Sequence, residues 1–380
     1  MSAAVVIGAI CLAAWIYLLL GRGGFWLARE RDDRDLPPQP SAWPRVVAVV
    51  PARNEADVIE RSIGSLIAQD YPGDFRVVLV DDASDDGTAA RAAALPDPAG
   101  RLTVLTGRPL TKGWTGKLWA VSQGVESAGA PDYLWITDAD IAHAPGTLRG
   151  LVARAEAGGL TLVSLMARLQ TGTWPERLLI PAFVFFFDML FPFGTVNDPR
   201  RRLAAAAGGC MLVRREALAA AGGIAAIRGE IIDDCALGAK LKAQGPIWLG
   251  LTRTSTSLRP YLTLGEIGRM VSRSAYAQLR YSPWLLAGTV AGMLLVYAAA
   301  PVLAALGAGW ARWMGAAAWA LMAISFQPML RYYRLSPLWG PALPLIGAIY
   351  TAFTVQSAID VWRGRGGMWK GRAQALAAAP

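Results

Sequence analysis

The chain has 380 residues, 54% of which are hydrophobic, and its mean hydropathy is +0.34. This composition is too apolar for an ordinary soluble protein and predicts segments that enter a membrane. The single histidine, His143, excludes a multi-histidine metal site, and three cysteines without ligand spacing, one of them in the first apolar run, argue against a disulfide framework and a zinc site. The formal net charge is +9, but the basic residues lie beside apolar runs and form no stripe with interleaved aromatics, which argues against nucleic acid as a partner.

Four apolar runs have about the length that a bilayer requires. They are Ala3–Leu20, Trp284–Leu306, Trp313–Leu330 and Leu338–Ile359. Residues 1–22 are predicted to be an N-terminal transmembrane anchor, because no small-residue cleavage site follows the first run. Residues 23–44, which are charged and then rich in proline, are interpreted as a linker. The alternative is that the runs are buried helices of a soluble core.

Arginines follow the first run and precede the second, which places the middle of the chain in the cytoplasm by the positive-inside rule. Residues 261–283 are predicted to be an interfacial connector, residues 284–360 transmembrane or re-entrant helices, and residues 361–380 a basic tail. Four simple spans would put this tail on the side of the N-terminus, against the rule. We therefore expect either that one C-terminal run is re-entrant or interfacial or that the rule fails here, and we favour a cytoplasmic tail.

Between residues 45 and 260, short apolar segments alternate with segments of helical periodicity, which predicts one domain with its own core. Strands are predicted at Arg45–Pro51, Phe75–Val80, Leu102–Thr106, Tyr133–Thr137 and Leu160–Ala167. Apolar strands separated by helices are typical of an α/β fold, here a Rossmann-like, mostly parallel sheet with helices on both faces. Leu178–Phe193 is apolar but short for a span. It is interpreted as a helix in the membrane interface, with a core helix of the domain as the alternative.

Acidic and turn residues follow three of the predicted strands. Pro51–Glu55 follows the first strand, Asp81–Asp82 ends the second, and an Asp-Ala-Asp motif, Asp138–Asp140, follows the fourth. The carboxyl ends of parallel strands meet at one edge of a sheet, where such folds bind ligands. The carboxylates of Asp138 and Asp140 can hold a hard divalent cation, and the cation can hold a diphosphate. The sequence therefore predicts a metal-assisted phosphate site at this edge.

Five motifs occur in the order expected of a known family. They are Val50–Glu55, Val80–Thr88, Gly116–Lys117, Thr137–Asp140 and Ile232–Asp234. Together they resemble the family 2 glycosyltransferases of GT-A fold, over about Arg45–Gly245. More narrowly, the whole chain resembles the hopanoid-biosynthesis-associated glycosyltransferases through Gly113–Trp119, Ile231–Cys235 and Ser272–Pro283.

The resemblance implies a nucleotide-diphosphate sugar as donor, for which we expect a UDP-sugar, and Mg²⁺ or Mn²⁺ as cofactor. The implied donor-binding residues are Pro51, Ala52, Arg53, Glu55, Asp82, Lys117, Asp138 and Arg273. Asp140 is the implied direct metal ligand, and Asp138 is expected to touch the ribose or the metal. Asp234 is the implied general base, with Asp233 as its acidic partner. The family has Glu-Asp at this pair, and Asp233 could instead cap the helix that follows.

The Gln-x-x-Arg-Trp motif of processive synthases is missing, since Glu266–Arg273 matches it poorly, so the resemblance implies one-step transfer with inversion. We expect a membrane-bound, metal-dependent glycosyltransferase that acts on a membrane lipid acceptor, with a hopanoid as candidate, at the cytoplasmic face of a bacterial inner membrane. One alternative is a polyprenyl-phosphate or sphingolipid-type glycosyltransferase. Others are a non-catalytic membrane scaffold and a transporter, the latter disfavoured by the low polar content of the predicted spans.

Overall fold

The computed structural model of the protein describes residues 2–366, 368–369 and 372–373. Contacts divide the chain into two compact units. The helical unit comprises Met1–Arg29, Thr171–Gly194 and Tyr261–Gly367. The sheet unit comprises Glu30–Gln170, Thr195–Pro260 and Met368–Pro380. Residues 171–194 therefore fold with the apolar ends of the chain, although they interrupt the sequence of the sheet unit.

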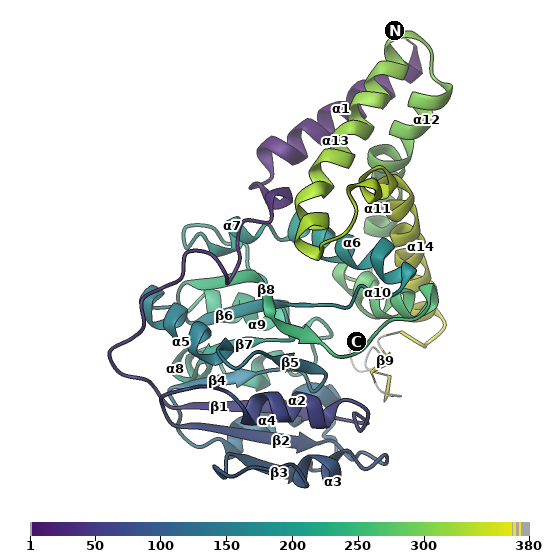
Figure 1. Cartoon of the computed structure of the whole chain (residues 1–380). Coiled ribbons are helices and arrows are strands. Elements are labelled where there is room, and N and C mark those ends of the chain that lie inside the picture. The colour runs from purple at the N-terminus through teal and green to yellow at the C-terminus, as the bar shows by residue number, and fades with distance from the viewer. Residues whose placement is uncertain (1, 367, 370–371, 374–380) are drawn as a thin grey trace. The chain divides into compact units, whose positions relative to one another are not determined.

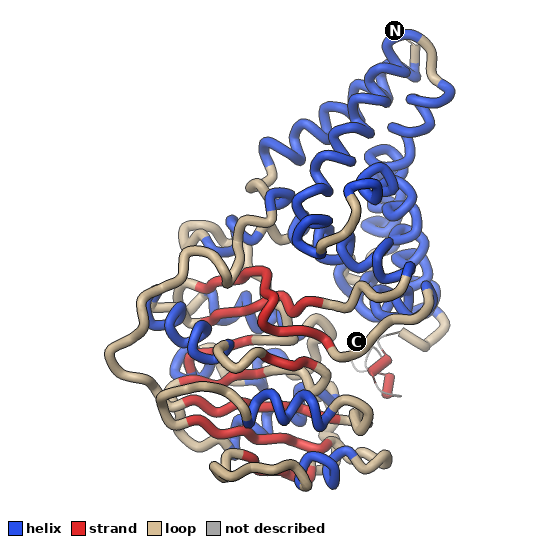
Figure 2. The backbone as a smooth tube through the Cα atoms, in the orientation of Figure 1, coloured by secondary structure: helices blue, strands red, loops and turns tan. Residues whose placement is uncertain are grey.

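An eight-stranded sheet forms the centre of the sheet unit, in the order β3-β2-β1-β4-β7-β6-β8-β5 (Figure 1, Figure 2). The strands are β1 (Val46–Ala52), β2 (Phe75–Asp81), β3 (Leu102–Thr106), β4 (Tyr133–Ile136), β5 (Ile141–His143), β6 (Leu162–Arg168), β7 (Met211–Arg214) and β8 (Ile247–Ser257). The pairs β1–β2, β1–β4, β2–β3 and β6–β8 are parallel. The pairs β4–β7, β6–β7 and β5–β8 are antiparallel. The predicted α/β fold is confirmed, with a mixed sheet that has more parallel than antiparallel pairs.

Helices cover both faces of this sheet. Those of the sheet unit are α2 (Ile59–Ile67), α3 (Thr88–Ala93), α4 (Gly116–Ser127), α5 (Thr147–Gly158), α8 (Arg215–Ala220), α9 (Asp233–Lys242) and the 3₁₀ turn η2 (Ile224–Ile227), and α7 (Phe193–Asn197) begins at the boundary between the units. Strand β1 is buried along its whole length, and its alternate side chains belong to two separate apolar clusters. Ala48 belongs to the cluster that contains Ile63 of α2, and Val47 to the cluster that contains Ala120 of α4. A strand buried on both faces needs a continuous apolar sequence, which explains why β1 lacks polar alternation.

The helical unit contains three helices that are long and apolar enough to cross a membrane: Ala3–Gly21, Pro283–Leu306 and Pro337–Trp362. They correspond to α1 (Ala3–Gly21), to α11 (Pro283–Met293) with the π-helix η3 (Leu294–Ala298) and α12 (Ala299–Leu306), and to η4 (Pro337–Ala342) with α14 (Leu343–Trp362). The unit also holds η1 (Phe25–Leu27), α6 (Trp174–Leu190), α10 (Leu264–Gln278) and α13 (Gly309–Tyr333).

The fourth apolar run, Trp313–Leu330, lies within α13 but is not among these candidate spans. Three candidate spans agree with the expectation that one C-terminal run is re-entrant or interfacial, and the number of crossings stays a prediction. Gln327 and Pro328 near its end and two tryptophans lower the hydropathy of this run. The helix itself is continuous and packs against α1 and α12.

Helix α6 begins before the predicted segment and is largely buried. Thr173 and Glu176 form a reciprocal capping box at its start, which fixes where the helix begins. Leu179, Ile180 and Phe185 are fully buried, and the helix packs against α13 and α14. This burial agrees with the alternative of a core helix, but the core is that of the helical unit.

Part of the segment predicted to be a linker pairs with β8. Arg31 forms a parallel bridge with Leu251 of β8, and the Asp32 backbone N–H donates to the Leu251 carbonyl at 3.0 Å. The Thr252 hydroxyl donates to the Asp32 carboxylate. Of the predicted basic tail, two short strands, β9 (Met368–Trp369) and β10 (Arg372–Ala373), are described; residues 367, 370–371 and 374–380 lie outside the described residues.

Candidate active site

The carboxyl ends of β1, β2 and β4 lie side by side. In the parallel register Ala52 is paired with Asp81, and Val49 is paired with Ile136, so the residues that follow each strand emerge at the same edge. Pro51 and Ala52 are buried within β1, so their side chains belong to the core and only their backbone is suited to contact a ligand. Parallel pairing thus brings together sequence segments that are far apart in the chain.

The Arg53 side chain is hydrogen-bonded to the turn that follows β2. Its guanidinium donates to the Asp82 carbonyl and, at 3.2 Å, to the Ala83 carbonyl, and it lies 3.9 Å from the Asp82 carboxylate. The Asp82 side chain is buried, and Ala83 has a left-handed backbone conformation that completes a tight turn. The two predicted donor-binding residues, Arg53 and Asp82, are therefore in contact.

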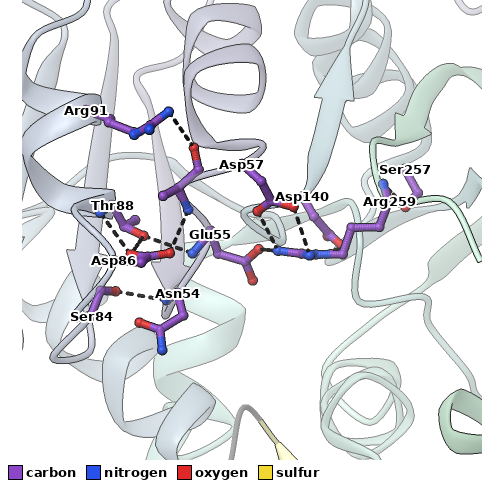
Figure 3. Close-up of polar contacts among 11 residues, drawn as sticks. Asn54, Glu55, Asp57, Ser84, Asp86, Thr88, Arg91, Asp140, Ser257 and Arg259 are labelled. Atoms are coloured by element: carbon purple, nitrogen blue, oxygen red, sulfur yellow. Dashed lines mark hydrogen bonds and ion pairs between the residues drawn. The ribbon is translucent and has the colours of Figure 1, made fainter. Parts of the chain in front are cut away.

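Glu55 lies in a loop that is tied to the start of α3 (Figure 3). Its backbone N–H donates to the Thr88 hydroxyl at 2.8 Å, and the Asn54 N–H donates to the Ser84 hydroxyl at 2.9 Å. Asp86 accepts from the backbone N–H groups of Ala56 and Thr88, at 3.0 Å each. These bonds fix the loop that carries the buried Glu55 carboxylate.

Lys117 joins two acidic motifs that are distant in the sequence. Its ammonium nitrogen lies 2.9 Å from Asp138 Oδ1 and 3.1 Å from Asp233 Oδ2. Only 17% of its side chain is exposed, so it is not a solvated lysine at a helix start. Burial acts to lower the pKa of Lys117, but Asp138 and Asp233 outweigh it and the pKa is raised, so the side chain stays charged.

Asp234 is fixed by two backbone donors. Its Oδ2 accepts from the Gly208 N–H at 3.0 Å, and its Oδ1 accepts from the Cys235 N–H at 2.7 Å. A Cβ atom at position 208 would lie 3.3 Å from the Lys117 ammonium nitrogen. Glycine at this position therefore lets the backbone come close to Lys117 and Asp234. Burial and the neighbouring Asp233 raise the pKa of Asp234 to about 6, against the lowering effect of Lys117. Neither Asp233 nor Asp234 is the N-cap of α9, since Ile232 holds that position.

Asp140 is paired with an arginine that the sequence analysis missed. Arg259 follows β8, and its Nε lies 3.7 Å from Asp140 Oδ2. The same guanidinium pairs with the Glu55 carboxylate and, at 3.1 Å, with Asp57 (Figure 3). No motif marks Arg259, because its partners come from loops that only the folded sheet brings near it.

His143 belongs to a buried hydrogen-bond network that includes Thr137, the residue before the Asp-Ala-Asp motif. Its Nε2 is 2.9 Å from the Thr137 hydroxyl, and its Nδ1 is 2.8 Å from the Ser255 hydroxyl. Thr137 in turn donates to the Gly209 carbonyl at 2.7 Å. Burial lowers the pKa of His143 to about 3, so the ring is neutral at physiological pH and serves to position Thr137.

The oxygen donors at this edge fit a hard dication that shares its coordination with a substrate. Asp138 and Asp140 offer carboxylate oxygens, which Mg²⁺ and Mn²⁺ prefer. Within the described residues, no group of three or more His, Cys, Asp or Glu side chains could hold a metal ion. Mg²⁺ in nucleotide sites is typically bound by one or two carboxylates together with substrate phosphates. The donor set therefore fits a dication that binds together with a diphosphate.

Arg273, the remaining predicted donor-binding residue, lies on α10 in the helical unit. Its role at the site stays a prediction. The other predicted residues, Glu55, Asp82, Asp138, Asp140, Asp233 and Asp234, all belong to the sheet unit.

The mixed sheet with an acidic edge at its parallel strand ends defines a protein of the GT-A class, a Rossmann-like fold. Residues 47–222 match the family model described as "Glycosyl transferase family 2". The match covers less than half of the chain, and over these residues the sequence is similar to that family.

Among curated proteins, the chain is 37% identical to "Succinoglycan biosynthesis protein ExoO" of Rhizobium meliloti (strain 1021), over 39% of this chain and 44% of that protein. It is 32% identical to an "N-acetylglucosaminyltransferase" of Rhizobium leguminosarum bv. viciae, over 46% of this chain and 40% of that protein. The chain thus matches less than half the length of either relative.

Among solved structures, the chain resembles the mannosyltransferase PcManGT of Pyrobaculum calidifontis, in complex with GDP-Man and Mn²⁺. The TM-score is 0.55 and the sequence identity is 22%, over 95% of this chain and 99% of that chain. This likeness confirms the GT-A fold.

Proposed function

We propose that the protein is a membrane-bound, inverting glycosyltransferase that moves a sugar from a nucleotide-diphosphate donor to a lipid acceptor. The observation that carries the proposal is the contact of Lys117 with both Asp138 and Asp233. It joins the Asp-Ala-Asp motif, suited to a dication and a diphosphate, to an acidic pair suited to proton transfer. Sugar transfer needs both functions next to each other, because charge develops on the leaving diphosphate while the acceptor hydroxyl loses a proton.

In this proposal Asp234 is the general base. A pKa of about 6 leaves it ionised at neutral pH yet basic enough to take a proton from a hydroxyl group in the transition state. The Gly208 and Cys235 N–H groups hold the carboxylate in one orientation, and its further lone pairs remain able to accept a proton. Asp233, paired with Lys117, acts as its positioning partner.

The donor is proposed to bind along the edge formed by β1, β2 and β4. Asp82 and Glu55 would read the nucleotide, with Arg53 fixing the turn that presents Asp82. Asp138 and Asp140 would hold Mg²⁺ or Mn²⁺, and the cation would offset the charge of the diphosphate. A UDP-sugar is the proposed donor, whereas the solved mannosyltransferase that shares the fold was captured with GDP-Man and Mn²⁺.

The lipid acceptor and the membrane location are proposed from the three apolar helices of the helical unit. Three crossings would return the chain after α14 to the side of the residues between the first and second spans. If the sheet unit is cytoplasmic, the basic tail after α14 is then cytoplasmic too, as the positive-inside rule requires. A hopanoid is the proposed acceptor, on the resemblance of three sequence segments described above.

The names of the curated relatives favour a second candidate acceptor. One of them is a succinoglycan biosynthesis protein, which supports transfer to a saccharide. Full-length protein in detergent, incubated with UDP- and GDP-sugars and with hopanoid, polyprenyl-phosphate or saccharide acceptors, distinguishes these candidates. We expect a glycosylated hopanoid from a UDP-sugar, formed with Mg²⁺ or Mn²⁺ and lost with EDTA. Product formation that is undiminished by EDTA, or no sugar transfer from any donor, would contradict the proposal.

A further inference from the structure

Arg259 lies at the centre of a second group of charges, separate from the Lys117 contacts. Its terminal nitrogens form a two-point ion pair with Asp57, at 3.1 and 3.2 Å, and one of them also pairs with Glu55. The Nε group is buried, makes no hydrogen bond within the described structure, and lies 3.7 Å from Asp140 Oδ2 (Figure 3). The guanidinium is therefore anchored on the Asp57 side and reaches towards Asp140 without completing a bond to it.

The two carboxylates of the Asp-Ala-Asp motif thus face two different fixed cations. Asp138 is paired with Lys117, and Asp140 is paired with Arg259. The two contacts differ in kind, because Lys117 makes a bond of 2.9 Å whereas the Arg259–Asp140 distance is that of a loose ion pair. Of these two ion pairs, the one between Arg259 and Asp140 is the longer and is the easier one for another cation to break.

We propose that Arg259 is a counter-ion of Asp140 in the free enzyme, and that a dication displaces Arg259 from Asp140 when the donor binds. The proposal rests on the proposed function, since it concerns the same Asp-Ala-Asp site. Arg259 stays anchored by Asp57 when Asp140 is taken, so it is a positioning residue that sets the affinity for the dication. The positive charge of Arg259 beside Asp140 repels a divalent ion that binds alone. The negative charge of the diphosphate reduces this repulsion when the ion and the nucleotide bind together.

The proposal predicts that the metal and the nucleotide bind together much better than the metal alone. A guanidinium fixed within about 4 Å of a metal ligand opposes a dication strongly enough to weaken its binding by at least about tenfold, even when solvent screens part of the charge. Replacement of Arg259 by a neutral residue should therefore tighten binding of the bare ion.

The test measures Mn²⁺ binding to the full-length protein in detergent, without any nucleotide, by electron paramagnetic resonance of the free ion. We expect Arg259→Gln to bind Mn²⁺ about tenfold tighter than the unchanged protein, and Arg259→Lys to lie between them. Arg200→Gln is the matched control, because Arg200 is exposed and paired with Asp198 outside the site. It removes the same charge and should leave Mn²⁺ binding unchanged. In the double variant Arg259→Gln, Asp140→Asn the gain should disappear.

Equal or weaker Mn²⁺ binding by Arg259→Gln, in protein whose thermal melting shows that it is folded, would overturn the proposal. So would an equal gain in Arg200→Gln, since the effect would then come from overall charge. The readout does not depend on sugar transfer. A protein that transfers sugar but shows no change in Mn²⁺ affinity contradicts this inference alone, and one that shows the change but transfers no sugar contradicts the proposed function alone.

Discussion

The ammonium group of Lys117 lies 2.9 Å from a carboxylate oxygen of Asp138. The lysine stands at the start of α4, and the aspartate lies two residues after β4, the strand next to β1. The bond therefore links a helix to the end of a central strand. The same ammonium group holds Asp233 at the start of α9. Asp234 is the next residue, so the carboxylates of Asp138, Asp233 and Asp234 all lie near the buried Lys117 ammonium group. Its positive charge offsets their mutual repulsion.

Replacement of Lys117 by methionine is expected to destabilise the sheet unit. It leaves Asp138 and Asp233 without their cation, and loss of one partner of a half-buried ion pair costs about 1–3 kcal/mol, discounted because Asp138 is about one-third exposed. Thermal melting in detergent measures the effect. Lys112→Met, an exposed lysine in the preceding loop, is the control and should melt like the unchanged protein. Equal melting of both variants would contradict the stabilising role of Lys117.

Asp140→Asn is expected to lower the rate of sugar transfer by at least about 100-fold. The amide keeps the size of the side chain but removes the charge that binds the dication, and with it the stabilisation of the leaving diphosphate. Initial rates at saturating donor measure this loss. Asp74→Asn serves as the control, since Asp74 lies before β2, at the opposite end of the strand. Retained activity in Asp140→Asn would rule out its role as a metal ligand.

Asp234→Asn is expected to lower kcat by about 10² to 10⁴, while the affinity for the donor nucleotide changes little. The melting temperature should change little, because relief from burying a charge offsets the loss of one of the two oxygens that accept backbone N–H bonds. Calorimetric titration with the nucleotide separates binding from chemistry. A larger loss in Asp233→Asn than in Asp234→Asn would reverse the roles given to the two residues.

The rate of transfer should depend on pH through Asp234. A general base works only when ionised, so kcat/KM is expected to rise with pH through about 6 and to level off above it. Below this value the protonated carboxyl cannot accept a proton, and the rate falls about tenfold per pH unit. A profile that stays flat between pH 5 and 8 would contradict the assignment.

His143 should make the protein less stable in acid. Its pKa is lowered by burial to about 3, whereas an unfolded histidine titrates near 6.5, so the stabilising contribution is present above 6.5 and is lost as the pH falls. The melting temperature of the unchanged protein is expected to fall more steeply between pH 6.5 and 4 than that of His143→Gln. Parallel curves would show that the histidine is accessible to protons in the folded state.

The parallel half of the sheet could be predicted from the sequence because its strands are continuous apolar runs bounded by turn residues. Strand β3 occupies the predicted residues, and β2 extends one residue further. In the other half of the sheet, β6 (Leu162–Arg168) lies close to its predicted residues, but β5, β7 and β8 were not predicted. Strand β8 ends in an alternation of threonine, serine and arginine, and β5 has only three residues, so neither has the apolar run that marks a buried strand.

The acidic members of the site could be predicted because they follow predicted strands or open a predicted helix. Their counter-ions were harder to find. Lys117 was identified from a short motif, but its bond to Asp233 depends on the packing of α4 and α9 in the fold. Arg259 pairs with Glu55, Asp57 and Asp140, which come from other loops, and no local pattern predicts such contacts.

The pairing of each acidic cluster with its own arginine or lysine has a consequence for how the protein matures. Internal cations already balance these carboxylates, so the fold of the sheet unit does not depend on a divalent ion. Under the proposed function, the ion would arrive with the incoming nucleotide and leave with the spent diphosphate. Turnover would follow the supply of the activated sugar, and a chelator would silence the protein without unfolding it.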